Sequence, residues 1–572
     1  MTSWSTACPD WAERITAQPQ RSLIPFDPLF PAEADAAEAI FRRLRIVKAP
    51  GAPTMGEACR EWIFDLVRAV FGAYDPDTGR RLIRYFFMLV SKKNTKSTTA
   101  AGIMLTALIR NWRQSGEFYI LAPTKEIADN SFGPAQDMVS ADPLLKDLLR
   151  VQPNYRQITH RNTGAILKVI AADAETVSGK NTVGLFIDEL WLFGKRTHAA
   201  NMLQEAMGGL ATNQEGFVIY GSTQSDAPPQ GVFADKLAEF RDIRDGKIID
   251  PRSLALIYEF PDRMLKDDSY LEPRNWYIPN PNLGASVDVE YLLDQEARNR
   301  RDGRAAHASF LAKHLNVQIG SSLRADGWAG ALVWARGTDR TLTLETLLER
   351  CEVVTVGLDG GGLDDLLGIG VIGRERGTKR WLVWGHAMIS DIGIERRKKN
   401  AEAYDRFEKQ GDLTKFTYEA FAPGGVWVPR NILFVTNLVK RIMDAGLLYA
   451  VGVDRRGIGA IVDALAEIGV TQEAENLDVV PQGTVLMGAI KTVEIKLADH
   501  SLLHADQELM TWCVENAVVI PTATAMMIAR DEAGYGKIDP LMAVFNAAHL
   551  MALNPEAQVG SMPTDYELPV WA

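Results

Sequence analysis

The sequence predicts an α/β chain with two separate sheet domains, and three observations carry this prediction. In the first half, short apolar runs of strand length alternate with segments of helical periodicity, as in a parallel sheet covered by helices. In the second half, three strand-like runs follow one another before helices and strands alternate again. The 572 residues are also too many for one hydrophobic core, which favours two or three domains.

The predicted strands of the first half are short and apolar. They occupy residues 83–90, 117–122, 165–171, 184–187 and 216–220. Continuous apolar runs of this length are typical of parallel strands that are buried on both faces. We therefore expect a parallel sheet with helices on both of its sides.

The predicted strands of the second half have a different order. They occupy residues 353–358, 367–373, 381–387, 448–453 and 477–480. The first three lie in succession, and the last two alternate with helices. This order resembles the ribonuclease-H-like fold.

Changes in these patterns divide the chain into five segments. We expect an N-terminal extension (1–30), a parallel-sheet domain (31–261), a connector with small helices (262–350), a second sheet domain (351–555) and an acidic tail (556–572).

Composition narrows the class of protein. Hydrophobic residues make up 47% and charged residues 24%, as in an ordinary soluble globular chain. No apolar run reaches the roughly 18 residues of a membrane span, and the N-terminus has no signal-peptide pattern, so we expect a cytosolic protein without membrane contact. The four cysteines lack disulfide or zinc spacing. The net charge of −11 does not exclude nucleic acid, because basic residues can still line a channel.

A basic stretch, "VSKKNTKST", lies between a predicted strand and a predicted helix. Lys96 and Ser97 stand where a phosphate-binding loop places its phosphate-contacting lysine and its magnesium-binding hydroxyl. Both customary glycines are missing, since Val90 and Thr95 take their places. A glycine there allows positive φ, so Thr95 implies strain or another loop shape. Taken alone, the stretch also fits a basic loop capped by Ser97 or Thr98.

Two further strand ends carry polar residues. "GLFIDELW" ends a strand in Asp188 and Glu189, a pair suited to hold magnesium and to polarise an attacking water. Helix capping by Asp188 is the alternative. "YGSTQS" places Ser222, Thr223 and Gln224 at the carboxyl edge of the same predicted sheet.

Three aspartates follow predicted strands or open a helix in the second domain: Asp359, Asp454 and Asp539. A two-metal nuclease needs carboxylates that converge from separate elements around ions roughly 3.5–4 Å apart. A hairpin turn, an N-cap and an Asp–Pro helix start would each explain one aspartate alone. Additional candidates are Asp364, Asp365, Lys537, His504, Asp506 and the run "RRKK" at 396–399.

From about residue 30 to 555 the chain resembles the large terminase subunit of tailed bacteriophages. The resemblance rests on "VSKKNTKST", "DAETVSGKNTVGLFIDE", "PNPNLG" and "FLAKHLNVQ". It implies an ASCE-type P-loop ATPase domain and a ribonuclease-H-like nuclease domain. The expected activities are ATP-driven translocation of double-stranded DNA into the procapsid and metal-dependent endonucleolytic cutting of concatemers. "GEACREWIFDLVRAVFG" lacks the glutamine with which the family reads adenine.

The resemblance also implies roles for individual residues. ATP would bind Asp188 and the loop residues Ser91, Lys92, Lys93, Asn94, Thr95, Lys96, Ser97 and Thr98. Ser97 and Asp188 would hold magnesium, and Glu189 would orient the water. Lys92 or Lys93 would supply transition-state charge, and Ser222 and Thr223 would couple hydrolysis to movement. Asp359, Asp454 and Asp539 would hold two Mg²⁺ or Mn²⁺ ions.

The implied partners are double-stranded DNA, a small terminase subunit and a portal protein. The implied assembly is a monomer in solution and a homopentamer on the portal, in the cytoplasm of the infected bacterial host. The missing glycines motivate an alternative, in which the chain is a nuclease or docking protein with a degenerate, nucleotide-independent ATPase-like domain. A helicase-like repair enzyme would need further helicase motifs, and the nuclease pattern occupies their place.

Overall fold

The computed structural model describes residues 4–171, 181–196, 198–319, 327–418, 429–454, 459–522, 525–530 and 536–557. The chain divides into two compact units, residues 1–323 and 324–572. Most of the tail, all of "DAETVSGK" and the arginines after Asp454 lie outside the described residues. No helix among the described residues is long and apolar enough to cross a membrane.

The first unit contains an eight-stranded sheet of mostly parallel strands. Its order is β10 (Ser253–Ile257), β3 (Tyr85–Leu89), β9 (Phe217–Ser222), β8 (Thr182–Ile187), β4 (Glu117–Ala122), β7 (Ile166–Ala171), β6 (Gln157–His160) and β5 (Leu149–Gln152). The strands from β10 to β7 run parallel, and β6 and β5 form an antiparallel edge. The predicted parallel sheet is confirmed.

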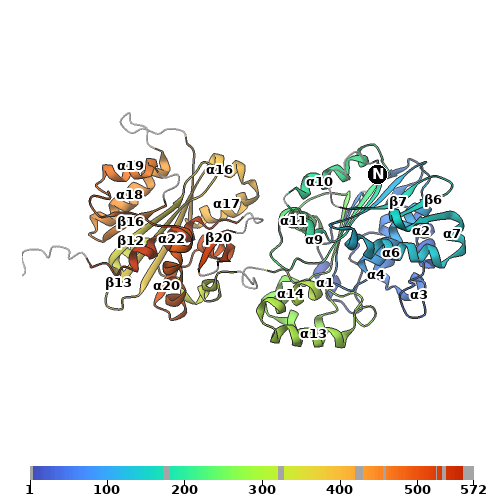
Figure 1. Cartoon of the computed structure of the whole chain (residues 1–572), viewed down its shortest axis with the longest axis horizontal. Coiled ribbons are helices and arrows are strands. Elements are labelled where there is room, and N and C mark those ends of the chain that lie inside the picture. The colour runs from blue at the N-terminus through green and yellow to red at the C-terminus, as the bar shows by residue number, and fades with distance from the viewer. Residues whose placement is uncertain are drawn as a thin grey trace, which may run out of the picture. The chain divides into compact units, whose positions relative to one another are not determined.

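Helices cover both faces of this sheet, and one strand shows why. Phe86 and Met88 of β3 belong to one apolar cluster, whereas Phe87 and Leu89 belong to another. Because successive side chains of a strand point to opposite faces, a continuous apolar run needs cover on both sides. Figure 1 shows α9 (Leu190–Phe193), α10 (Ala199–Ala206) and α11 (Gly231–Arg244) on one face, and α2 (Pro31–Arg43), α4 (Glu61–Phe71) and α6 (Lys125–Ala141) on the other.

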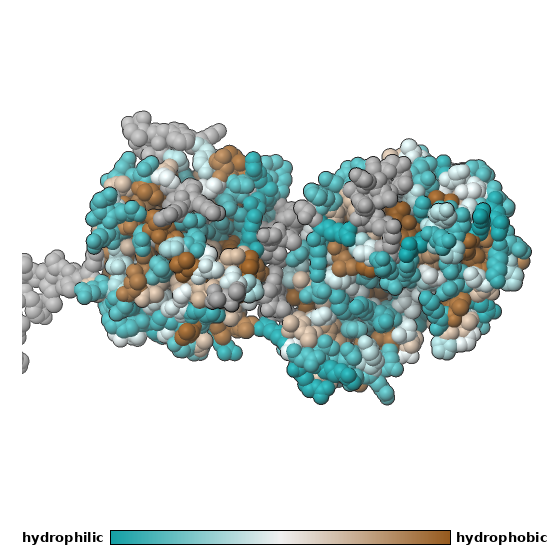
Figure 2. Space-filling view, viewed as in Figure 1, coloured by the Kyte–Doolittle hydropathy of each residue, from teal (hydrophilic) through white to brown (hydrophobic). Residues whose placement is uncertain are grey.

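The remaining elements of the first unit are α1 (Trp11–Thr16), α3 (Met55–Ala58), α5 (Lys96–Ile109), α7 (Pro143–Leu148), α12 (Asp262–Lys266), α13 (Val289–Arg301), α14 (Arg304–Leu315) and the strand pair β1 (Tyr74–Asp75) and β2 (Arg80–Arg81). Trp276, Leu292 and Phe310 pack into the cluster that also holds Phe86. The outward side of α13 is hydrophilic (Figure 2). Much of the predicted connector therefore lies against the first unit, and its boundaries stay a prediction.

The second unit is built on another mixed sheet. Its order is β11 (Thr338–Asp339), β18 (Leu502–Ala505), β14 (Trp381–Ser390), β13 (Leu367–Glu375), β12 (Cys351–Gly360), β16 (Leu448–Val453) and β17 (Leu477–Val479), and β15 (Leu413–Phe416) pairs with β14. The three successive strands β12, β13 and β14 are antiparallel, whereas β16 and β17 continue the sheet in parallel. The predicted strand succession is confirmed.

Helices flank this sheet too. Figure 1 shows α18 (Arg430–Asp444) and α19 (Gly459–Glu467) on one side of the strands and α20 (Met487–Ala498) and α22 (Asp539–Met551) on the other. The other elements are α15 (Leu344–Arg350), α16 (Asp391–Arg396), α17 (Ala401–Gln410), α21 (Glu508–Asn516) and the hairpin of β19 (Ala517–Pro521) and β20 (Met526–Arg530).

Candidate functional site

The loop between β3 and α5 has the backbone shape of a glycine-containing loop, although it contains no glycine. Thr95 has a φ of 61° and Lys93 a φ of 72°. Positive φ is uncommon for residues with a side chain and costs conformational energy. The strain expected at Thr95 is therefore present, and surrounding contacts must offset it.

Asparagine side chains supply those contacts. The Asn94 side chain donates to the Ser91 carbonyl at 3.0 Å and to Oδ1 of Asn280 at 2.8 Å, and it accepts from the Asn282 backbone N–H at 3.0 Å. Nδ2 of Asn282 donates to Oγ1 of Thr95 at 3.1 Å. The segment "PNPNLG" thus holds the loop in its positive-φ conformation.

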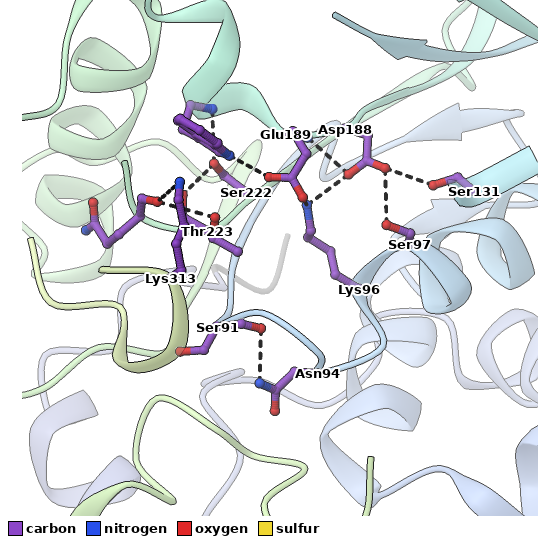
Figure 3. A network of polar contacts seen from close by, with 12 residues as sticks. Ser91, Asn94, Lys96, Ser97, Ser131, Asp188, Glu189, Ser222, Thr223 and Lys313 are labelled. Atoms are coloured by element: carbon purple, nitrogen blue, oxygen red, sulfur yellow. Dashed lines mark hydrogen bonds and ion pairs between the residues drawn. The ribbon is translucent and has the colours of Figure 1, made fainter. Parts of the chain in front are cut away.

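Lys96 lies at the centre of the strand ends. Its Nζ is 2.9 Å from Oδ1 of Asp188 and 2.7 Å from Oε1 of Glu189 (Figure 3). Oγ of Ser97 and Oγ of Ser131 both donate to Oδ2 of Asp188, at 3.2 and 3.0 Å. The residues predicted for phosphate, metal and water are therefore in mutual contact.

Strand order explains this convergence. β9 lies between β3 and β8, and all three are parallel, so their carboxyl ends share one edge of the sheet. The loop follows β3, Asp188 and Glu189 follow β8, and Ser222 ends β9 with Thr223 after it. This edge is where ligands bind in open α/β sheets.

Burial and charge oppose each other at this edge. Burial alone would raise the pKa of Glu189, but the Lys96 ammonium outweighs it and the pKa is lowered. Burial alone would lower the pKa of Lys96, but Asp188 and Glu189 outweigh it and the pKa is raised. Lys96 and Glu189 therefore stay charged at neutral pH.

Some predicted loop residues lie apart from this centre. The side chains of Lys92 and Lys93 are exposed, and Thr98 is half-buried in the first turn of α5. Oγ of Ser222 accepts from the Trp191 backbone N–H at 3.1 Å, and Oγ1 of Thr223 donates to the Gln224 carbonyl at 3.3 Å. Two residues that the sequence did not single out as site residues also contact the network.

These two residues are Trp191 and Lys313. Nε1 of Trp191 donates to Oε2 of Glu189 at 2.6 Å, and Nζ of Lys313 lies 3.0 Å from the centre of the Trp191 ring. Lys313 comes from α14, within the predicted connector. Its position in "FLAKHLNVQ" gave no direct signal, because a lysine near a helix end is ordinarily solvated.

In the second unit, strand register places two of the predicted aspartates side by side. Leu358 of β12 pairs with Val453 of the parallel β16. Asp359 and Asp454 follow these residues directly, so they occupy neighbouring positions on adjacent strands.

The third aspartate is brought in by α22. Asp539 opens this helix, with Pro540 in its first turn. A Cβ on Gly368 would lie 2.3 Å from the Asp539 carbonyl carbon, and one on Gly357 would lie 1.9 Å from the Ala543 carbonyl oxygen. These glycines let the helix backbone rest directly on the sheet, which puts Asp539 beside the end of β12.

The three carboxyl groups interact electrostatically. Burial raises the pKa of Asp359 to about 8, and the charges of Asp539 and Asp454 add to the rise, whereas Lys537 opposes it. Burial also raises the pKa of Asp539, and its Oδ2 is buried without a hydrogen-bond partner. Among the described residues, no group of three His, Cys, Asp or Glu side chains is close enough as it stands to hold a metal ion. The metal assignment stays a prediction.

The additional candidates have varied surroundings. Lys537 is buried and forms an ion pair with Asp365, whereas Asp364 is exposed. His504 is buried, and both of its ring nitrogens lie within hydrogen-bond distance of backbone carbonyls, of Ala505 at 2.9 Å and Trp334 at 2.8 Å. This environment is that of a structural histidine.

The other candidates are at the surface. Asp506 and Arg396 are well exposed. Lys398 is exposed and pairs with Glu395 at 2.6 Å, and the Arg397 side chain donates to the Asp364 carbonyl at 2.8 Å. The side chain of Lys399 lies outside the described residues.

Comparisons with known proteins match two successive domains of one family. The chain matches the family model for the ATPase domain of the terminase large subunit over residues 61–228. It matches the model for the endonuclease domain of the same family over residues 256–554. The two matches follow each other along the chain without overlap.

Individual relatives are more distant. The large terminase subunit of Enterobacteria phage HK97 is 22% identical over 481 residues, covering 83% of this chain and 87% of that protein. Protein YmfN of Escherichia coli K12 is 22% identical over 361 residues, covering 61% of this chain and 74% of that protein. The crystal structure of the HK97 large terminase has a TM-score of 0.48 at 21% identity, covering 90% of this chain and 99% of that one. Since the endonuclease match alone spans more than half of the sequence, the chain belongs to the terminase large subunit family, with an ATPase domain followed by an endonuclease domain.

Proposed function

We propose that the first unit hydrolyses ATP at the edge formed by Lys96, Ser97, Asp188 and Glu189, and that this hydrolysis moves double-stranded DNA into a procapsid. The family implies the packaging role. The observation that carries the nucleotide site is the buried Lys96, which pairs with both acidic residues at the carboxyl ends of the strands.

The residues have distinct tasks in this proposal. The N-terminus of α5 binds the phosphates, with Lys96 on the terminal ones. Ser97 and Asp188 are hard oxygen donors already in contact, and they would hold Mg²⁺, which neutralises phosphate charge when bound. Glu189 accepts a proton from, and orients, the attacking water. Lys96 must exchange its carboxylate contacts for phosphate contacts when ATP enters.

Ser222 and Thr223 would couple hydrolysis to a movement of the segment that follows them. The next residue, Gln224, accepts at its carbonyl from Lys313 at 3.0 Å and donates its N–H to Oδ1 of Asn316 at 3.2 Å. The end of β9 is thus bonded to the helical segment that includes α14. A shift at Thr223 would reach α14 through these bonds.

We also propose that Asp359, Asp454 and Asp539 hold two divalent ions, Mg²⁺ or Mn²⁺, for cutting concatemeric DNA. The unpartnered, buried Oδ2 of Asp539 and the like charges on the neighbouring carboxylates fit a site that takes up cations. The ions would stabilise the attacking and leaving oxygens of the phosphodiester. Asp359, Asp454 and Asp539 would position them.

The partners in this proposal are a small terminase subunit, which selects the genome, and a portal protein. The chain would be a monomer in solution and a homopentamer on the portal, in the cytoplasm of the infected bacterium. Family membership supports these proposals.

Thermal unfolding with and without Mg-ATP tests the nucleotide site. ATP should raise the melting temperature of the wild type, and Lys96→Ala should remove the shift. Lys195→Ala, which alters an exposed lysine paired with Asp226, should keep it. An absent shift in the wild type would favour the alternative, a nuclease or docking protein whose ATPase-like domain binds no nucleotide. That alternative rests on the two missing loop glycines, whose places Val90 and Thr95 take.

Nicking of plasmid DNA in Mn²⁺ tests the second site. Asp359→Asn and Asp454→Asn should each abolish nicking. Asp506→Asn, at an exposed carboxylate of the same unit, should leave it intact. Retained nicking in both site variants would move the metal site elsewhere.

A further inference from the structure

Lys313 is a buried lysine for which the described part of the chain provides no ion-pair partner. Its side chain is 7% exposed, and its Nζ donates to the Gln224 carbonyl and lies over the Trp191 ring. Among the described residues, no carboxylate lies within ion-pair distance of this Nζ. Burying an ammonium group is costly unless it meets an anion. An anion that arrives with a ligand would complete its surroundings.

The position of Lys313 identifies that ligand. The Lys92 backbone N–H in the phosphate loop donates to the Lys313 carbonyl at 2.8 Å. Trp191, under the Lys313 ammonium, donates to Glu189 at 2.6 Å. In Figure 3 the side chains of Lys313 and Lys96 lie on either side of Glu189, above the loop that carries Ser91 and Asn94. The ammonium is therefore beside the catalytic carboxylate, where the terminal phosphate of a triphosphate lies.

Other polar groups around this place also lack partners. Both amide atoms of Gln224 and the hydroxyl of Ser91 are buried without a hydrogen bond within the described part of the chain. Buried polar groups are nearly always bonded, so unpartnered ones indicate a missing ligand or water. These groups lie at the two segments that Lys313 bridges, the loop and the end of β9.

Electrostatics agrees with this geometry. Burial lowers the pKa of Lys313 to about 7, with smaller contributions from the Lys92 and Lys195 charges, whereas Asp226 and Glu189 oppose the shift. A phosphate oxygen at the ammonium would raise the pKa again.

We propose that Lys313 is a second phosphate-binding lysine of the nucleotide site, which contacts the γ-phosphate and thereby ties α14 to its presence. This inference rests on the proposed ATP site. It gives Lys313 the charge role that the family resemblance implied for Lys92 or Lys93, whose side chains are exposed. With ADP bound, no γ-phosphate is available, and Lys313 keeps its contacts with Gln224 and Trp191.

Equilibrium binding of ADP and of the non-hydrolysable triphosphate AMP-PNP to the full chain, with Mg²⁺, tests this. Lys313→Met should weaken AMP-PNP roughly tenfold or more, as expected for a lost charged hydrogen bond, and leave the ADP affinity within about twofold. Lys313→Arg should retain the preference for the triphosphate. A merely structural lysine would affect both nucleotides alike.

Lys195→Met is the matched control. Lys195 also lies over the Trp191 ring, at 4.9 Å, but it is 43% exposed and paired with Asp226 at 2.8 Å. Both affinities should remain those of the wild type. Wild-type affinity of Lys313→Met for AMP-PNP would overturn the inference while leaving the ATP site in place. Failure of the wild type to bind either nucleotide would overturn both proposals.

Calorimetry of the wild type gives a second readout, which needs no folded variant. Above its pKa of about 7 the free Lys313 side chain is mostly neutral. Binding of a γ-phosphate should therefore take up a proton at about pH 8, and ADP binding should not. Titrations in buffers of different ionisation enthalpy measure this uptake. Equal uptake for the two nucleotides would contradict the inference.

Discussion

The two candidate sites have opposite charge balance. At the edge of the first sheet, Lys96 stands between Asp188 and Glu189, so burial is offset by pairing. In the second unit, the half-buried Asp359 lies near the buried Asp539 and near Asp454, and the pKa of both Asp359 and Asp539 is raised. The first site contains a cation of its own, Lys96, whereas the second has an excess of carboxylates that cations from outside would offset.

This difference predicts how each site responds to ligand. A nucleotide entering the first site has to replace existing ion pairs, so binding there is an exchange of partners. A metal ion entering the second site relieves repulsion between carboxylates and displaces bound protons. Removing the Lys96 charge should therefore destabilise the first unit. Removing the charge of one carboxylate should instead stabilise the metal-free second unit.

The largest effect is expected for Lys96→Ala. It leaves the buried Asp188 and the half-buried Glu189 without their cation, which should lower the free energy of unfolding of the first unit by roughly 3–5 kcal/mol. Denaturant unfolding of the full chain measures this loss. Lys195→Ala removes a lysine from a partly exposed pair and should cost less than about 1 kcal/mol. Equal losses in the two variants would contradict the charge balance described for the first site.

Asp359→Asn should have the opposite effect in the absence of metal and raise the free energy of unfolding of the second unit. The pKa of Asp359 is raised to about 8 in the folded chain, so the folded state holds this proton more tightly than the unfolded state does. Above that pH the folded state carries the charged carboxylate in a partly desolvated place, which lowers the free energy of unfolding. The wild-type second unit should therefore lose stability as pH rises from about 4 to 8. The variant should lack this loss and be more stable by about 2–3 kcal/mol at pH 9, after allowance for solvent screening.

Thermal unfolding in EDTA across this pH range checks the sign. Adding Mn²⁺ should restore the thermal stability of the wild type and leave that of Asp359→Asn nearly unchanged, since a ligand stabilises only the state that binds it. Asp506→Asn, at an exposed carboxylate, should follow the wild type. Destabilisation of Asp359→Asn at pH 9 in EDTA would mean that the carboxylates are not in mutual repulsion.

The sequence predicted the parts of each site that lie at strand ends. Apolar runs are directly followed by Asp188, Asp359 and Asp454, and Glu189 comes after Asp188. Parallel strands bring their carboxyl ends to one edge of a sheet. The apolar runs likewise predicted the central strands of both sheets. They did not predict β10 or the β5–β6 edge, because short edge strands leave a weak periodic signal.

The contacts between segments that are distant in the chain could not be predicted from the sequence. The missing glycines raised the possibility of a degenerate loop, but Asn280 and Asn282, nearly two hundred residues away in the chain, hold Asn94 and Thr95 in place. Lys313 reaches the site from the predicted connector. Hydrogen bonds of this kind depend on tertiary packing and leave no periodic signal.

Asn282→Ala tests the support of the loop. The substitution removes the bond to Thr95 and leaves the buried Nε1–H of Trp62 without its acceptor at 2.8 Å. We expect a loss of roughly 1–2 kcal/mol in unfolding free energy and weaker nucleotide binding. Asn299→Ala, whose side chain donates to the Gln295 carbonyl of its own helix, should change neither by much. Normal nucleotide affinity in Asn282→Ala would show that the loop holds its shape without "PNPNLG".

The smallest effect is expected for Lys93→Gly, and it distinguishes strain from charge. Lys93 has a φ of 72° and an exposed side chain, so glycine should relieve the left-handed conformation and stabilise the first unit by about 1 kcal/mol or less. Lys92 is exposed too but is not among the residues with positive φ, so Lys92→Gly should destabilise slightly instead. Denaturant unfolding compares the two, and steady-state ATPase assays follow kcat. If Lys313 supplies the charge at the γ-phosphate, kcat should survive in Lys93→Gly; a large fall in kcat with unchanged stability would return that role to Lys93.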